Sequence, residues 1–147
     1  MNSAPKTDDL TLPPLVVLYD GVCGLCDKSV QWLLDHDPQG RFHFTPLQGE
    51  TAAALRARHA EIPETLESML LVDSRGPVRT VALRSRAVFL TLRELGGVWS
   101  WIALLRVFPA FLTDLGYRVV ASIRYRVWGE LDACRLPSPE ERARFLP

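Results

Sequence analysis

Three residues near the beginning of the chain have the types and the spacing for sulfur chemistry. They are Asp20, Cys23 and Cys26, in the segment YDGVCGLC. Two residues three positions apart on a helix have Cα atoms about 5 Å apart, inside the range of about 4.4–6.8 Å that a disulfide requires. A cysteine pair with this spacing can open and close a disulfide without a large movement of the backbone.

A strand and then a helix are predicted around these residues. The run from Leu15 to Tyr19 is apolar throughout, as in the buried strands of parallel sheets, and Asp20-Gly21 ends it. After this turn, apolar residues recur at helical spacing while polar residues take the opposite face. The apolar stripe consists of Val22, Leu25, Cys26, Val30 and Leu33.

The positions of the two cysteines on this helix predict different roles for them. Cys23 lies at the helix N-terminus, where unpaired N–H groups and the helix dipole stabilise a thiolate, so we expect an exposed nucleophile. Cys26 belongs to the core-facing stripe, where burial disfavours a thiolate, so we expect it to be the resolving thiol. Cys23 attacks a partner disulfide and Cys26 then releases the partner, without a metal or an organic cofactor.

Two roles are open for Asp20. Aspartate is a common turn residue whose carboxylate accepts hydrogen bonds from nearby amides, and we favour this loop-shaping role. The alternative is a catalytic one, in which Asp20 relays a proton to and from Cys26 as a general base.

The order of the remaining elements predicts an α/β fold. Helical and strand patterns alternate, and a turn at Asp73–Gly76 makes the last two strands an antiparallel hairpin. Ser85 is the expected N-cap of the helix that ends at Gly96-Gly97, and Pro77 is the expected first residue of the preceding strand. The core therefore has the order β-α-β-α-β-β-α, with strands at 15–19, 41–45, 68–72 and 77–81 and helices at 22–37, 50–59 and 85–95.

Two further helices are predicted after this core, at 99–107 and 113–128, and a polar, partly irregular tail follows Gly129. The chain has 147 residues, which suits one domain with one hydrophobic core. We expect a flexible tail at 1–14 and a single domain at 15–147, with its core at about 15–97 and a helical extension at about 98–147.

The overall composition excludes several classes of protein. Hydrophobic residues make up 48% and charged residues 23% of the chain, which excludes wholesale disorder. The formal net charge is zero, so indiscriminate nucleic-acid binding is not expected. Three cysteines cannot form a closed set of disulfides, and the first 14 residues lack a secretory apolar run. We therefore expect a cytoplasmic protein.

Several segments of the chain resemble the DCC family of thiol-disulfide oxidoreductases, named for residues that stand here as Asp20, Cys23 and Cys26. The similar segments are YDGVCGLCDKSVQWLL, RFHFTPLQ, SRAVFLTLRELGG and RYRVWGELDACRLPSPE, so the resemblance covers about residues 15–146. It implies a thioredoxin-like core and dithiol-disulfide exchange with a protein or small-molecule substrate. The chain departs from thioredoxins before the third strand. Thioredoxins usually have a cis-proline there, and residues 67–69 of this chain contain no proline.

Metal binding is the main alternative for the two cysteines. A closed zinc site needs four ligands, and the remaining candidates, Cys134 and three histidines, have no suitable spacing. Two thiolates alone suit a soft ion such as Cu(I), so a soft-metal-binding or membrane-peripheral adaptor without redox turnover stays open. Cys134 either packs as a small apolar residue, which we favour, or acts as a second resolving thiol.

The other polar and aromatic candidates have less specific patterns. None of the histidines is a predicted catalyst, and His43 is expected to face solvent. Arg84 and Arg86 are expected to be solvated, the alternative being an anion site for a group such as a glutathione carboxylate. The C-terminal helices interleave aromatic residues with arginines, and we favour core packing over contact with a membrane surface or a partner protein. The aromatic residues are Trp99, Trp101, Phe108, Phe111, Tyr125 and Trp128.

Overall fold

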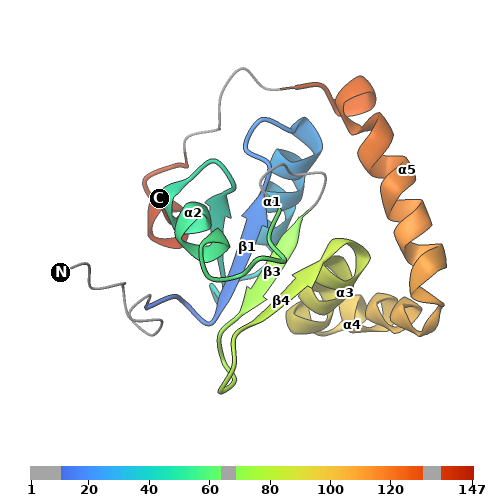
Figure 1. Cartoon of the computed structure of the whole chain (residues 1–147), viewed down its shortest axis with the longest axis horizontal. Coiled ribbons are helices and arrows are strands. Elements are labelled where there is room, and N and C mark those ends of the chain that lie inside the picture. Colours follow the sequence, from blue (N-terminus) through green and yellow to red (C-terminus); the bar gives the residue numbers. More distant parts are fainter. Residues whose placement is uncertain (1–10, 64–68, 131–136) are drawn as a thin grey trace.

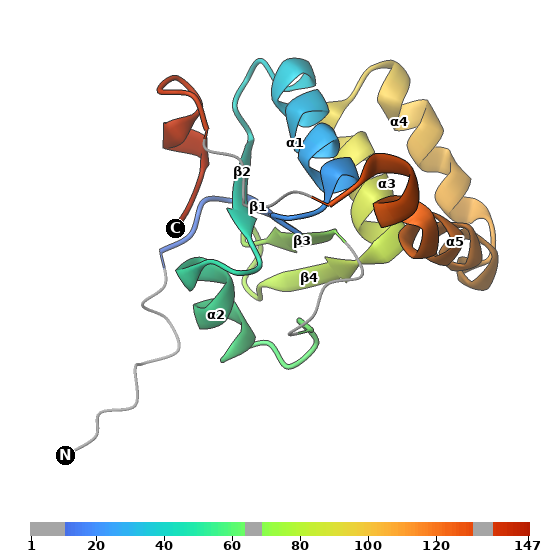
Figure 2. The same cartoon turned by 90° about the horizontal axis from the view of Figure 1, so that it is seen from above.

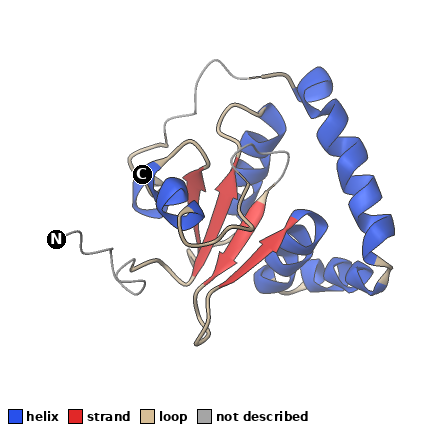
Figure 3. Cartoon of the chain, viewed as in Figure 1, coloured by secondary structure: helices blue, strands red, loops and turns tan. Residues whose placement is uncertain are grey.

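A four-stranded mixed sheet forms the centre of the molecule (Figure 3). The computed structural model of the chain describes residues 11–63, 69–130 and 137–147. β1 pairs in parallel with β2 and antiparallel with β3, and β4 pairs antiparallel with β3. The predicted parallel β-α-β unit and the predicted hairpin are therefore confirmed. In the sheet order β2-β1-β3-β4, the strands are Phe42–Pro46, Leu15–Tyr19, Leu70–Asp73 and Thr80–Leu83.

Helices cover both faces of this sheet (Figures 1 and 2). α1 (Gly24–His36) and α3 (Arg84–Leu95) cover one face, and α2 (Glu50–Arg56) covers the other. Successive residues of a strand point to opposite faces, so the uniformly apolar β1 contributes side chains to the hydrophobic core on each face of the sheet. Val17 lies in the core beneath α1 and α3, and Val16 lies in the core beneath α2. The fold is mixed α/β with a thioredoxin-like architecture.

Several predicted element boundaries are wrong: α2 ends at Arg56 and not at 59, and α5 (Ala110–Trp128) begins at Ala110 and not at 113. β4 begins at Thr80 and not at Pro77, since a longer turn follows Asp73, whose Oδ1 accepts the N–H of Arg75 at 3.0 Å. Ser85 does not cap α3, because the helix already begins at Arg84 and no side chain caps its N-terminus. The Ser85 hydroxyl instead donates to Asp114 of the C-terminal helix, so a long-range contact replaces the local one.

The last residues of the chain return to the sheet beside β2. Phe145 forms a parallel bridge with Phe44 directly after the short helix η2 (Arg142–Arg144). His43, which the sequence predicted to be exposed, is half-buried there, and this burial lowers its pKa. The prediction failed because the local alternation of a strand says nothing about a segment one hundred residues away.

The helical extension after α3 consists of two arms (Figure 1). The first comprises α4 (Val98–Ile102) and the 3₁₀-helix η1 (Ala103–Val107), and the second is α5 (Ala110–Trp128). Among the described residues no single helix is long and apolar enough to cross a bilayer, but the two arms together pass that test while bent by 115°.

Tertiary packing divides the aromatic residues of these arms into two groups. Trp99 is half-buried and packs edge-on against Trp32 of α1, with ring centroids 4.7 Å apart, as the favoured core role predicted. Trp128 is half-buried, whereas Trp101, Phe108, Phe111 and Tyr125 are exposed, so core packing is the wrong prediction for these four. The side chains that contact the rest of the molecule, such as Trp99 of α4 and Tyr117 of α5, lie on the other side of these helices.

Candidate active site

Asp20, Cys23 and Cys26 lie together where β1 passes into α1. Cys23 has an extended backbone and is the N-cap of α1, and its Sγ accepts a hydrogen bond from the N–H of Cys26 at 3.4 Å. The sulfur therefore faces a backbone N–H donor in the first turn of the helix. The strand-to-helix placement predicted for the cysteines is therefore confirmed, and the Cys23 sulfur takes the place of the side-chain oxygen that usually caps a helix.

Cys23 is fully buried, which corrects the expectation of an exposed thiol. The end of α5 covers it: Glu130 forms an antiparallel bridge with Cys23, and the N–H of Gly24 donates to the carbonyl oxygen of Gly129 at 3.3 Å. A Cβ on Gly24 would lie 2.4 Å from the carbonyl oxygen of Trp128, so only glycine permits this close approach. The sequence could not show the cover because it comes from more than one hundred residues downstream.

Arg124 is the functional candidate that the sequence did not single out. Its side chain is buried, with Nη1 3.8 Å from the Sγ of Cys26 and Nη2 3.5 Å from Oδ2 of Asp20. The guanidinium thus connects the resolving thiol to the carboxylate. The available signal was an arginine within the otherwise apolar and aromatic stripe Tyr117, Val120, Arg124 and Trp128.

The carboxylate of Asp20 has partners on both oxygens. Oδ1 accepts from the N–H of Val22 and from Nε2 of Gln48, each at 3.1 Å, and Oδ2 accepts from the hydroxyl of Tyr125. The contact with Val22 is the loop-shaping bond that the sequence favoured. Beyond that bond, Asp20 fixes the position of Arg124, which is a role that only the tertiary structure reveals.

The ionisation of the site follows from its burial. Burial raises the pKa of the Cys26 thiol, the neighbouring Cys23 sulfur raises it further, and Arg124 acts in the opposite direction, with a result of about 12. Burial also raises the pKa of Tyr125, helped by its hydrogen bond to Asp20, to about 12. At neutral pH Cys26 is therefore a thiol and Tyr125 a neutral donor.

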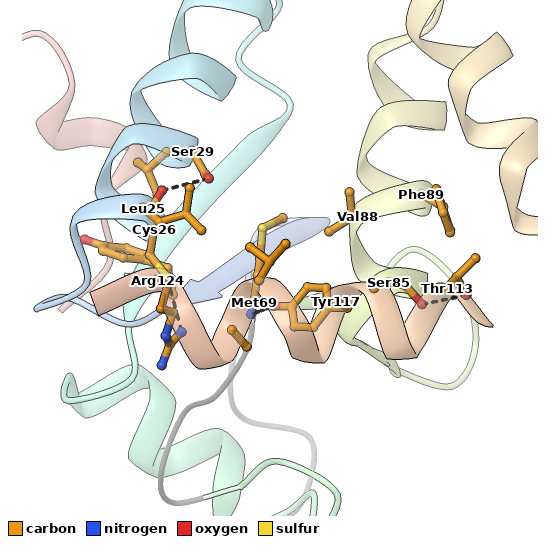
Figure 4. A pocket seen from close by; sticks show the side chains of 15 residues that line it. Leu25, Cys26, Ser29, Met69, Ser85, Val88, Phe89, Thr113, Tyr117 and Arg124 are labelled. Atoms are coloured by element: carbon orange, nitrogen blue, oxygen red, sulfur yellow. Dashed lines mark hydrogen bonds between the residues drawn. The ribbon is translucent and has the colours of Figure 1, made fainter. Parts of the chain in front are cut away.

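A cavity of about 350 Å³ lies between α1, α3 and α5 beside the resolving cysteine (Figure 4). Cys26 and Arg124 stand at one end, and Ser85 and Thr113 stand at the other. The hydroxyl of Tyr117 in its wall accepts the N–H of Met69 at 2.9 Å and so joins α5 to the start of β3. Most of its lining is apolar, so the cavity suits an apolar group of a substrate.

The remaining predicted residues do not join the site. Cys134 and residues 67–68, where the sequence lacks the cis-proline, lie outside the described residues. Of the two arginines expected to be solvated, Arg86 is exposed on α3 and Arg84 is half-buried. Within the described part of the chain, no three histidine, cysteine or carboxylate side chains are grouped so that they could hold a metal ion.

Comparison with known proteins agrees with this geometry. The family model of the DCC1-like thiol-disulfide oxidoreductases matches residues 17–130, which include the cysteine motif and α5. The chain belongs to this family. The uncharacterized protein YuxK of Bacillus subtilis (strain 168) is 35% identical to the chain over 136 residues, which are 92% of this chain and 96% of that protein.

A plant member of the family is similar over a smaller share of its length. The DCC family protein At1g52590, chloroplastic, of Arabidopsis thaliana is 31% identical over 122 residues, which are 82% of this chain and 69% of that protein. No solved structure matches the chain. The shared family supports a redox role, and the residues that perform it have to be argued from the site.

Proposed function

We propose that the chain is a thiol-disulfide oxidoreductase that exchanges disulfides through Cys23 and Cys26. Cys23 is the nucleophile, Cys26 is the resolving thiol, and Asp20 assists by holding Arg124 next to Cys26. One observation carries the proposal: two free cysteines share the first turn of α1, with an N–H at one sulfur and a guanidinium at the other.

The reaction begins at Cys23. Its thiolate attacks one sulfur of a substrate disulfide, a new S–S bond forms, and the other substrate sulfur leaves as a thiolate that takes a proton. The thiol of Cys26 loses its proton and attacks the Cys23 sulfur, which releases the second substrate sulfur as a thiol. The substrate gains two electrons and two protons, and the Cys23–Cys26 pair becomes a disulfide. The same steps in reverse oxidise a dithiol substrate.

Arg124 acts on the second half of this reaction as a positioning residue. Because burial keeps Cys26 protonated at neutral pH, its attack is the step that most needs a nearby positive charge. The guanidinium reaches its sulfur at 3.8 Å and is held in turn by Asp20. Since α5 supplies this side chain, we propose that residues 15–147 work as one domain.

The high pKa of Cys26 also argues against the alternative of a soft-metal adaptor. A site built from two thiolates has to deprotonate Cys26, and burial opposes that ionisation. Exchange with a protein or small-molecule disulfide needs only one thiolate at a time and no cofactor. We propose that this exchange takes place in the cytoplasm, where a dithiol is kept available in its reduced form.

The test is the stoichiometry of the reaction with an aromatic disulfide, 5,5′-dithiobis(2-nitrobenzoate), in a Cys134→Ser background. The chain with both motif cysteines releases two thionitrobenzoate ions and retains none, because Cys26 resolves the mixed disulfide. Cys26→Ser releases one and retains one on Cys23, and Cys23→Ser reacts far more slowly. Equal reactivity of the two single variants would contradict the assigned roles.

A further inference from the structure

The most unusual surface of the molecule is the outside of the helical extension. Of the large apolar side chains that are exposed among the described residues, fifteen lie between residues 98 and 127, and the remaining one is Val78. Two of the fifteen also contact the body of the molecule, since Val120 lines the cavity and the hydroxyl of Tyr125 donates to Asp20. We call the other thirteen the outer helical surface: Val98, Trp101, Ile102, Leu104, Leu105, Val107, Phe108, Phe111, Leu112, Leu115, Val119, Ile123 and Val127. Apolar patches of this extent on soluble proteins mark interaction sites.

The residues of this surface lie on both arms of the extension. The arms meet at the bend between η1 and α5, which projects at one corner of the molecule (Figures 1 and 2). The largest exposed fractions flank that bend, 81% for Val107 and 76% for Phe111. Along α5, Leu115, Val119 and Ile123 recur every four residues and form an outward apolar stripe. The outward face of α5 is therefore apolar where that of a solvated helix is polar.

The charges on this surface have one sign. Arg106, Arg118 and Arg126 are exposed between residues 98 and 128. The other two charged side chains of this segment point inward, since Asp114 accepts a hydrogen bond from Ser85 and Arg124 pairs with Asp20. Every charge presented outward by residues 98–128 is therefore an arginine.

We propose that the outer helical surface lies on a lipid bilayer that contains anionic lipids. Apolar and aromatic side chains interleaved with arginines are the composition of helices that bind in the plane of a membrane interface. Exposed Trp101 suits the headgroup region, and the three arginines pair with lipid phosphates. Two copies of the chain, paired by this face, would bring the same arginines together with no carboxylate to compensate them.

The contacts of α5 with the rest of the molecule indicate that the helix lies at the membrane surface and does not cross the bilayer. The helix is about 28 Å long, but its inner face bonds Met69 through Tyr117 and pairs Arg124 with Asp20. A bilayer core could not surround the helix without breaking these polar contacts. Because Arg124 touches Cys26 from the inner side, lipid on the outer side lies about one helix diameter, roughly 10 Å, from the dithiol. If the proposed redox function is correct, its substrates are membrane-associated.

Co-sedimentation of the full chain with phospholipid vesicles tests the proposal. We expect binding to phosphatidylcholine vesicles with about one-third phosphatidylglycerol, and little binding to phosphatidylcholine alone. High salt weakens the binding, because it screens the arginines. Bromine-labelled lipid chains should quench tryptophan emission, and this quenching should be lost in Trp101→Phe, since the other three tryptophans are half-buried. We expect the Cys23→Ser and Cys26→Ser variants to bind the vesicles as well as the wild-type chain does. Loss of vesicle binding can therefore be distinguished from loss of the proposed redox function.

Matched variants identify the surface. Arg118→Gln together with Arg126→Gln should weaken binding about 25-fold, at about fivefold for each arginine removed, whereas the exposed Arg142→Gln outside the surface should not. Phe111→Ser should weaken binding, and the equally exposed Val78→Ser should not.

Two outcomes would overturn the proposal. The first is the absence of binding to the anionic vesicles at low salt. The second is a concentration-dependent dimer of the wild-type chain, measured by light scattering, that Phe111→Ser dissociates while vesicle binding is unchanged. That result would assign the surface to a second copy of the chain.

Discussion

Replacement of Gly24 by alanine tests whether the end of α5 limits access to Cys23. The added Cβ would lie 2.4 Å from the carbonyl oxygen of Trp128, and real Cβ atoms essentially never come closer than 3.0 Å to such an atom. The end of α5 must therefore withdraw by at least about 0.6 Å. The hydrogen bond between Gly24 and Gly129 is already 3.3 Å long, so this withdrawal breaks it.

The magnitude of the effect follows from that bond. A hydrogen bond of this kind contributes about 0.5–1.5 kcal/mol net, so its loss raises the population of uncovered Cys23 by roughly two- to thirteenfold. Because Cys23 is fully buried under the cover, it reacts only from the uncovered state. The rate of alkylation of Cys23 by iodoacetamide should rise by the same factor, measured by mass spectrometry in a Cys134→Ser background.

Gly116→Ala is the matched control for this experiment. Gly116 lies within α5 and has nothing within 4 Å of an added Cβ, so alanine there gains helix propensity without a clash. Denaturant unfolding of both variants verifies that they remain folded under the alkylation conditions. If Gly24→Ala and Gly116→Ala react at the wild-type rate, the cover formed by α5 does not control access, and the reasoning is refuted.

Three further predictions concern ionisable side chains. Arg124→Gln should slow the second, Cys26-dependent release from an aromatic disulfide at least about tenfold and shift its pH profile upward, while Arg124→Lys retains most of the rate. At pH 8, Cys26 should alkylate about a thousandfold more slowly than an ordinary peptide thiol, because a pKa of about 12 leaves it protonated; rapid double alkylation would contradict this. Arg75 lowers the pKa of Asp73 and of Glu94 through hydrogen bonds to both, a stabilisation present above their unfolded-state pKa near 4 and lost as the pH falls below it. Arg75→Gln should therefore reduce the free energy of unfolding by about 0.5–1 kcal/mol at pH 7 and by nothing near pH 2, measured with denaturant.

Much of the core and the location of the cysteines could be predicted from local pattern. The unbroken apolar run of β1 and the helical stripe of α1 encode a buried strand followed by an amphipathic helix. These two elements place Cys23 at the helix N-terminus and Cys26 on the inner face. Periodicity determines such features because it depends on residues a few positions apart.

Only the tertiary structure decided how the dithiol is enclosed. Arg124 reaches Cys26 across 98 residues of sequence, and Glu130 covers Cys23 across a similar span. Helical spacing gives α5 one stripe with Tyr117, Val120 and Arg124 and another with Leu115, Val119 and Ile123, and the spacing alone does not say which of them meets the core. In the structure the side of α5 with Tyr117 and Arg124 faces inward, where these residues contact Met69 and Asp20, and the more regular apolar stripe with Val119 is exposed. These contacts join segments far apart in the sequence, and no local pattern encodes them.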